Sequence, residues 1–289
     1  MILRSVADRR RRVGAAVIVS GDECDDSAVT VQRREVLVAE HQVETASSDK
    51  YYFLVRRLHS LSGLIPVGVF LFMHLAANAS VLAPGPPGAE FQKSVERIHA
   101  LGPLLVPVEI VGIFIPLLFH TLVGFQIIFT GKSNAQHYPY GANIRYTLQR
   151  ATGMIAFVFI LYHVWQMHWL GKGIPGGGKF ELYDTGGGPA AAVTTAAAIQ
   201  AAWYIAPLYA IGILSAVFHL ANGIWTSLIT WGVTIRPKTQ RASGYVCTAF
   251  GLLLAAIGLG ALTGFRTFDA QKAAVTGTGH TVTSVETRH

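Results

Sequence analysis

Four histidines stand in four separate apolar stretches of the sequence. They occur in "FLFMHLAAN", "PLLFHTLVGFQ", "FILYHVWQM" and "SAVFHLANGIW", as His74, His120, His163 and His219. An imidazole in such surroundings needs a hydrogen-bond partner or a metal, because losing its hydration is unfavourable. These four positions are therefore the first candidates for a functional site, and the next question is which elements carry them.

Composition indicates a membrane protein. Of the 289 residues, 51% are hydrophobic and 13% are charged, whereas charged residues make up about a quarter of a soluble domain. The net charge of +7 comes with no long basic run in the apolar part, which argues against a nucleic-acid partner. Two cysteines, Cys24 in a polar leader and Cys247 in an apolar segment, do not predict a disulfide framework or a cysteine metal site.

Five stretches are apolar over the length of about 20 residues that a membrane-spanning helix requires. We therefore predict an all-α membrane protein with five transmembrane helices, joined on one side by Gly- and Pro-rich surface loops. The predicted spans are 60–83, 103–130, 146–170, 200–231 and 244–264. The transmembrane domain is expected over 51–264, after a polar leader at 1–50 and before a tail at 265–289. We expect the leader to be disordered, or to result from an upstream start codon.

The basic residues near the span ends predict the orientation of the chain. One side carries Arg56, Arg57, Lys132, Arg145, Arg150, Arg236, Lys238 and Arg241, whereas the opposite loops mix lysine and arginine with glutamate and aspartate. The first side is expected to face the cytoplasm. The N-terminus would then be cytoplasmic and the C-terminal tail would lie outside.

Helix geometry sorts the four histidines into two levels. At a rise of about 1.5 Å per residue, His74 and His163 lie about 12 and 10 Å from the outer ends of their spans. His120 and His219 lie about 25 and 28 Å from the outer ends of theirs. The two levels are roughly 15 Å apart, and each has two histidines on two different helices.

Two imidazoles at one level of a helix bundle can hold one haem iron. Zinc would need four ligands in one place, and a proton relay would not need two matched pairs. We therefore predict two bis-histidine b haems in a four-helix haem-binding bundle with a fifth helix beside it. The bland alternative is four core histidines bonded to neighbouring carbonyls. Small residues near the histidines would give room for a porphyrin, namely Gly63, Gly124, Gly153 and Gly223.

The first two spans resemble the third and fourth, which suggests a duplication. His120 and His219 are each followed by glycine four residues later. Two further histidines compete as ligands. His59 is expected to be a surface or interface residue at the cytoplasmic mouth of the first span. His168 lies about 140° around the helix from His163, so only one of them faces inward, and the parallel with the first span selects His163.

Four segments of the sequence closely resemble a known family. They are "FLVRRLHSLSGLIPVGVFLFMHLAAN", "EIVGIFIPLLFHTLVG", "LQRATGMIAFVFILYHVWQMHWL" and "SAVFHLANGIWTSLITWGVTIRPKTQR". They are similar to the di-haem cytochrome b558 membrane anchor of succinate:menaquinone oxidoreductases, the five-helix type that is related to the anchor of di-haem fumarate reductases. The resemblance covers roughly 51–264.

The resemblance implies ligands, partners and a location. His120 and His219 would hold the cytoplasmic, high-potential haem, and His74 and His163 the outer, low-potential one. A flavoprotein subunit and an iron–sulfur subunit would dock on the cytoplasmic face of a bacterial membrane, and menaquinone would accept the electrons. The chain has no flavin fingerprint and no cysteine cluster, so it is expected not to oxidise succinate alone. A glutamate that some fumarate reductase anchors use for proton transfer is replaced here by Val217.

The quinone site and the haem propionates have weaker candidates. Glu109 is the one acidic residue in the predicted spans, about 16 Å along the axis from His120 and about 20° around the helix. It is a candidate for the quinone and proton site, and a structural polar group is the equal alternative. Asn78 and His168 are weaker candidates for the same role. The three arginines that could pair with propionates, or serve only as membrane anchors, are Arg56, Arg57 and Arg150.

Two other functions fit the same pattern. A haem b anchor of a hydrogenase or a formate dehydrogenase would carry the same histidines but would purify with metal-centre subunits. A transporter that uses membrane histidines for protons or metal would purify colourless.

Overall fold

The structure, a computed structural model, describes residues 51–130, 141–271 and 273, and this part of the chain is helical without a β-strand. It has five helices that are long and apolar enough to cross a membrane, so the prediction of an all-α protein with five spans is confirmed. They are Tyr51–Leu82, Gly102–Thr130, Asn143–Met167, Ile205–Thr230 and Pro237–Arg266. The predicted leader at 1–50 and the tail from 274 lie outside the described residues. The chain divides at Leu54 into two units, and the description below concerns the second, from Val55 onward.

The first two spans are not uniform α-helices. In the first, helical residues 55–62 lead into the π-helical turn η1 (Gly63–Val67), followed by α3 (Gly68–Ala79) and the 3₁₀ turn η2 (Ser80–Leu82). Pro66 lies inside η1. Proline has no backbone N–H, so this residue cannot donate the hydrogen bond of a regular α-helix. The second span consists of η3 (Gly102–Leu104), α5 (Leu105–Glu109), a second π turn η4 (Ile110–Phe114) and α6 (Ile115–Thr130).

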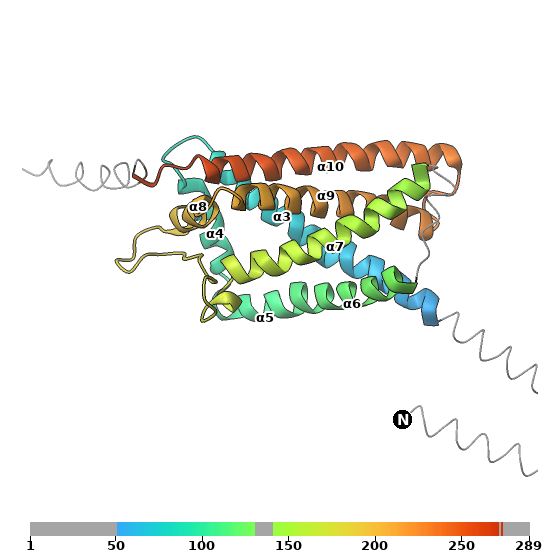
Figure 1. Cartoon of the computed structure of the whole chain (residues 1–289), viewed down its shortest axis with the longest axis horizontal. Helices are drawn as coiled ribbons and strands as arrows, with labels where there is room; N and C mark the ends of the chain where they lie inside the picture. Colours follow the sequence, from blue (N-terminus) through green and yellow to red (C-terminus); the bar gives the residue numbers. More distant parts are fainter. Residues whose placement is uncertain (1–50, 131–140, 272, 274–289) are drawn as a thin grey trace, which may run out of the picture. The chain divides into compact units, whose positions relative to one another are not determined.

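The last three spans are continuous α-helices. They are α7 (Gly141–Met167), α9 (Ile205–Thr230) and α10 (Pro237–Arg266). Helix α9 packs against both α7 and α10, and α3 packs against α10 (Figure 1). The second span contacts the first through η1. All four histidine-bearing helices are therefore joined in one bundle.

Helix α10 packs through a seam in which four of the five residues are glycine or cysteine. Gly244, Cys247, Gly251, Leu254 and Gly258 are all buried and follow one another at alternating steps of three and four, which is the spacing of a heptad seam. A Cβ atom at Gly251 would lie 2.9 Å from the Cβ of Ala221, and one at Gly258 would lie 2.7 Å from a methyl group of Ile213. Because lipid is as apolar as these side chains, close packing holds this seam together.

The connections after the first and third spans contain two helices that the sequence did not predict. Helix α4 (Ala89–His99) lies between the first two spans, and α8 (Ala191–Gln200) precedes α9. The predicted start of the fourth span at 200 is wrong, since α8 ends there and α9 begins at Ile205. Buried side chains of α4, α8, α9 and α10 form one hydrophobic cluster at this end, which includes Phe91, Val95, Ala191, Ile199, Tyr209 and Phe265.

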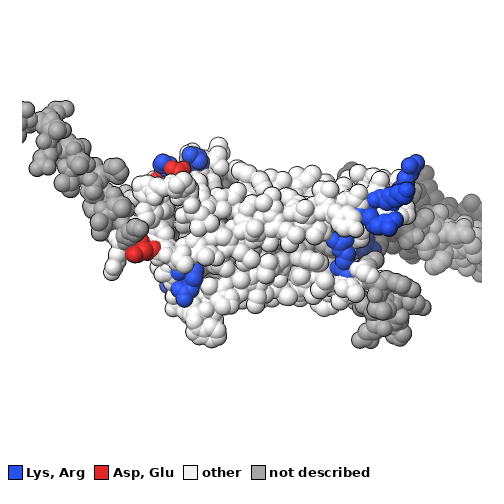
Figure 2. Space-filling view, turned by 90° about the horizontal axis from the view of Figure 1, so that it is seen from above, with Lys and Arg blue, Asp and Glu red and all other residues white. Residues whose placement is uncertain are grey.

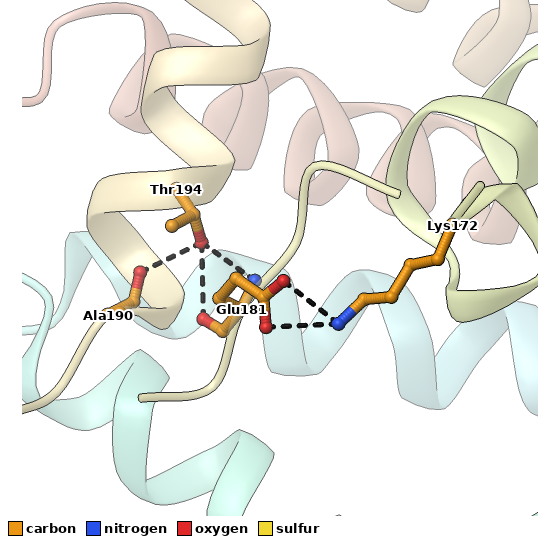
Figure 3. A network of polar contacts seen from close by, with 4 residues as sticks. All are labelled: Lys172, Glu181, Ala190 and Thr194. Carbon is orange, nitrogen blue, oxygen red and sulfur yellow. Dashed lines mark hydrogen bonds and ion pairs between the residues drawn. The ribbon is translucent and has the colours of Figure 1, made fainter. Parts of the chain in front are cut away.

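A polar network ties the long loop at 172–190 to α8 (Figure 3). The hydroxyl of Thr194 accepts a hydrogen bond from the amide of Glu181, donates to the carbonyl of Ala190 at 2.9 Å, and lies 3.2 Å from the carbonyl oxygen of Glu181. The Glu181 carboxylate lies 2.9 Å from the ammonium group of Lys172. The amide of Gln92 on α4 donates to the carbonyl of Leu182 in the same loop. Together α4, α8 and this loop cover one end of the bundle, and we call them the outer cap.

Charge divides the two ends of the bundle. The end opposite the outer cap, here named the basic end, carries Arg56, Arg57, Arg145, Arg150, Arg236, Lys238 and Arg241. The described residues at this end, 55–62, 120–130, 141–152 and 225–248, include no aspartate or glutamate. Figure 2 shows one face of this distribution, with basic side chains alone at one end and both kinds at the other.

Candidate functional site

The structure brings two of the four membrane histidines together in the half of the bundle near the basic end. The rings of His120 on α6 and His219 on α9 have centroids 5.9 Å apart, and their planes are inclined by 88°. We call them the inner pair. The two residues are 99 positions apart in the sequence, and their side chains meet in the interior of the bundle.

Backbone carbonyls determine which ring nitrogen of the inner pair carries the hydrogen. The Nδ1 atom of His120 lies 2.9 Å from the carbonyl oxygen of His59, and Nδ1 of His219 lies 3.0 Å from that of Gln149. A carbonyl oxygen only accepts hydrogen bonds, so Nδ1 is the donor in both rings. The lone pair of each ring is then on Nε2, which is the arrangement that a histidine ligand to a metal needs.

Two glycines let the rings of the inner pair fit against the neighbouring spans. A Cβ atom at Gly63 would lie 2.3 Å from the ring of His120, and one at Gly153 would lie 2.8 Å from the ring of His219. Neither position could therefore hold a side chain without displacing the ring. The sequence analysis predicted that these glycines give room for a porphyrin, whereas the structure places them directly against the imidazole rings.

The first span thus supports the histidine on the second, as the third supports the histidine on the fourth. A Cβ atom at Gly124 would contact the ring of His59, and one at Gly223 would contact the amide of Gln149. The Gln149 amide donates to the carbonyl of His219 and accepts from Asn222. The ring of His59 instead stacks on His120, with centroids 4.0 Å apart. His59 is therefore an interior neighbour of the inner pair and not a surface residue, whereas the alternative that it is an interface residue stays a prediction.

The other two histidines meet nearer the outer cap. The rings of His74 on α3 and His163 on α7 have centroids 5.7 Å apart and planes inclined by 77°. We call them the outer pair. Nδ1 of His163 lies 3.2 Å from the hydroxyl of Tyr209, and this hydroxyl donates to the side-chain oxygen of Gln166 at 2.7 Å. Since the tyrosine hydrogen is used in that bond, its oxygen accepts from Nδ1 of His163, and Nε2 again keeps the lone pair.

Sequence analysis missed Tyr209 and Gln166, although both are buried and polar. Gln166 also donates to the carbonyl of Ala198 in α8, which links the outer pair to the outer cap. Both lie close in sequence to a predicted ligand, Gln166 three residues after His163 and Tyr209 ten before His219. A polar side chain in an apolar span, close to a predicted ligand, was the sequence signal that could have identified both residues. Two imidazoles face each other at each level. In three of the four rings Nδ1 is hydrogen-bonded, which leaves Nε2 free to bind a metal. The residues therefore fit the axial ligation of a haem iron at both levels.

A polar cluster lies at the ends of the second and third spans that are opposite the basic end. Glu109, the last residue of α5, accepts a hydrogen bond from the indole of Trp169 at 3.1 Å, and its carboxylate lies 3.5 Å from Nε2 of His168. Burial lowers the pKa of His168, and the nearby Glu109 carboxylate opposes this change. We call these three residues the outer polar cluster. It joins two spans beside the level of the outer pair.

Two angular estimates from the sequence were wrong. The value of 140° between His163 and His168 assumed one helix, but α7 ends at Met167 and His168 has extended backbone angles. The value of 20° between Glu109 and His120 assumed a regular α-helix, whereas the π turn η4 lies between them. The structure also places Asn78 with its amide 2.7 Å from the carbonyl of His74, one turn earlier.

The three predicted arginines lie at the basic end, where two of them contact neighbouring spans. Arg150 donates to the carbonyl of Ile128 in α6, and its guanidinium lies 5.3 Å from the centre of the Tyr146 ring. Arg57 lies 5.4 Å from the centre of the Trp231 ring at the end of α9. Arg56 is exposed.

Comparison with known proteins gives one strong similarity. No family model matches the chain. The chain is 36% identical over 216 residues to the succinate dehydrogenase cytochrome b558 subunit of Bacillus subtilis (strain 168). The match covers 75% of this chain and 97% of the relative, so it includes nearly the whole length of that protein.

Proposed function

The chain belongs to the family of succinate dehydrogenase cytochrome b558 subunits, and from this membership we propose that it passes electrons through two b haems to menaquinone. It would receive them from the iron–sulfur subunit and would tether that subunit and the flavoprotein subunit to the membrane. Oxidation of succinate would belong to the flavoprotein and not to this chain. The family membership argues against a hydrogenase or formate dehydrogenase anchor and against a metal or proton transporter.

The observation that carries the proposal is the presence of two facing histidine pairs at two levels of one bundle. His120 and His219 would hold one haem, and His74 and His163 the other. A bound b haem supplies one-electron redox chemistry at its iron. The protein's part is to orient the imidazoles, which the carbonyls of His59 and Gln149 and the hydroxyl of Tyr209 do by accepting from Nδ1.

The purified protein should therefore carry two low-spin b haems per chain. Haem extracted as its pyridine complex and compared with chain concentration measures this ratio, and a reduced-minus-oxidised spectrum identifies the haem type. A value of one or none per chain would contradict the proposal, whereas co-purification with a flavoprotein would test the family assignment separately.

The basic end supports a cytoplasmic docking face. Its seven described cations come without a carboxylate, and lysine and arginine are retained on the cytoplasmic side of bacterial membranes. We take the N-terminus to be cytoplasmic and the C-terminal tail to lie outside. The iron–sulfur subunit would dock on this face, close to the inner pair. Arg56, Arg57 and Arg150 are at the same end and remain our candidates for haem propionates.

The outer polar cluster is our candidate for the quinone and proton site. Glu109 is the one described carboxylate of the second span, and an ionisable group at such a depth is a functional candidate. The outer cap covers the end of the bundle, so menaquinone would approach from the lipid, between the second and third spans. Glu109 would then exchange a proton with the reduced ring. Asn78 is a weaker candidate because its amide is already bonded to the carbonyl of His74.

The Tyr209→Phe variant should raise the midpoint potential of the outer haem and leave that of the inner haem unchanged. The phenol oxygen accepts from Nδ1–H of His163, which makes the ring more electron-donating and favours ferric iron. A spectroscopic redox titration of the variant measures both potentials. Tyr183→Phe, which alters a tyrosine of the outer cap, is the matched control. Equal shifts in both haems, or none, would show that Tyr209 does not act on His163.

A further inference from the structure

A groove with a volume of about 400 Å³ lies between α7, α9 and α10 in the half of the bundle near the basic end. Figure 1 shows the ends of α7 and α10 closest at this end and farther apart toward the middle of the bundle, with α9 between them. The residues that line the groove are Arg145, Thr152, Leu214, Ser215, Val217, Phe218, Ala221, Asn222, Cys247, Thr248, Gly251, Leu252 and Ala255. None of them belongs to either histidine pair or to the outer polar cluster.

Most polar side chains of the groove have hydrogen-bond partners within the protein, whereas the buried side-chain oxygen of Asn222 has none in the part of the chain that the structure describes. The hydroxyl of Thr152 donates to the carbonyl of Leu148 at 2.7 Å, and that of Thr248 donates to the carbonyl of Gly244 at 2.8 Å. The amide of Asn222 donates to Gln149 at 2.8 Å. The walls therefore offer mainly hydrocarbon contact, which suits an alkyl chain better than a quinone ring whose two oxygens need hydrogen bonds.

Charge distinguishes the end of the groove nearest the membrane surface. Arg145 is the charged residue of the lining, and its guanidinium lies 4.3 Å from the centre of the Trp225 ring. The indole of Trp225 is itself fixed by a hydrogen bond of 2.8 Å to the carbonyl of Gln240. The described residues of the basic end include no carboxylate, so none of them neutralises Arg145, and an anionic headgroup would do so.

The length of the groove matches one leaflet. Along α10 it extends from the level of Gly244, which lies beside Arg145, to Ala255. These eleven steps correspond to about 16 Å at the α-helical rise, which is about half of a hydrocarbon core of roughly 30 Å. An occupant would thus have an anionic head at the basic end and an apolar chain that reaches the middle of the membrane.

We propose that this groove binds an anionic phospholipid, with one acyl chain between α7 and α10 and the phosphate on Arg145. Basic pockets between transmembrane helices are known to recognise the headgroups of anionic lipids. The site would be a permanent lipid position on the outside of the haem-binding bundle. It does not depend on the number of haems or on the location of the quinone site.

The test uses the intact complex, purified in mild detergent and incubated with equal amounts of phosphatidylglycerol and phosphatidylethanolamine. Native mass spectrometry then counts the lipids retained. The parent protein should retain phosphatidylglycerol in preference. Arg145→Gln should lower that retention by about fivefold, since one basic residue near the surface has an effect of this order. Arg241→Gln, which removes a charge from the same end outside the groove, is the matched control and should change little.

A second variant separates charge from shape. Ala255→Phe places a ring in the far part of the groove, on a half-buried residue that is not part of the α10 seam, and should also reduce retention. Haem content and co-purifying subunits show whether either variant is folded. Equal retention of the two lipids by the parent would overturn the proposal. So would unchanged retention in both folded variants, or menaquinone found in the groove in place of phospholipid.

Discussion

The His219→Ala variant is expected to lose the haem nearer the basic end and to keep the outer one. The imidazole of His219 is one of two facing side chains at its level, and its loss would leave the inner iron with a single axial histidine. Haem content should fall to about half, and electron transfer from succinate to quinone should fall to background because the remaining haem is the distal one. Haem quantitation and a redox titration measure both effects.

Variants of the other three histidines test the pairing. His120→Ala should remove the same spectral component as His219→Ala, while His74→Ala and His163→Ala should remove the other. His99→Ala is a suitable control, since His99 is a histidine of α4 that belongs to neither pair, and its Nδ1 lies 3.0 Å from the carbonyl oxygen of Val95 in the same helix. The pairing would be wrong if His74→Ala and His219→Ala lost the same component.

The Glu109→Gln variant is expected to keep both haems and to lose quinone reduction. The amide has nearly the shape of the carboxylate and can still accept from Trp169, but it cannot exchange a proton with a reduced quinone. Succinate-driven reduction of a menaquinone analogue should fall by about a hundredfold or more, which is the usual scale for loss of a general acid or base. Reduction of the inner haem by succinate should remain.

Two controls test whether the loss of activity is specific to the quinone step. Succinate oxidation with a soluble acceptor that draws on the flavoprotein or iron–sulfur subunit should be unaffected, because the block lies downstream. Glu90→Gln alters an exposed carboxylate of the outer cap, which pairs with Lys93, and should reduce quinone normally. Normal quinone turnover in Glu109→Gln would assign Glu109 a structural role and would direct attention to His168 and Asn78.

The spans could be predicted because their signals are local. A run of apolar residues long enough to cross a bilayer is visible in a single window, and the helix rise is nearly constant. The same two facts placed His74 with His163 and His120 with His219, since depth depends only on the distance to the span end. The structure brings those same residues together.

Features that depend on neighbours in space could not be predicted in this way. Helices α4 and α8 are too short to span a membrane, and they are stabilised by a cluster assembled from four separate segments. Tyr209 and His59 reach their partners across helix interfaces, where sequence spacing gives no guide. Angles around a helix were also less reliable than depth, because each π turn changes every later angle by a large amount while changing the length only slightly.

The π turn at Gly63–Val67 accounts for an inserted residue. Gly63 precedes His74 by 11 positions, whereas its counterpart Gly153 precedes His163 by 10. In a continuous α-helix one extra residue would rotate everything after it by about 100°, and His74 would face away from its partner. A π turn accommodates the extra residue within one wider helical turn, so the residues after it keep their orientation. An alignment of the two halves without a gap would match His74 to Val164, so we expect the correct alignment of the two halves to have a one-residue gap within this turn.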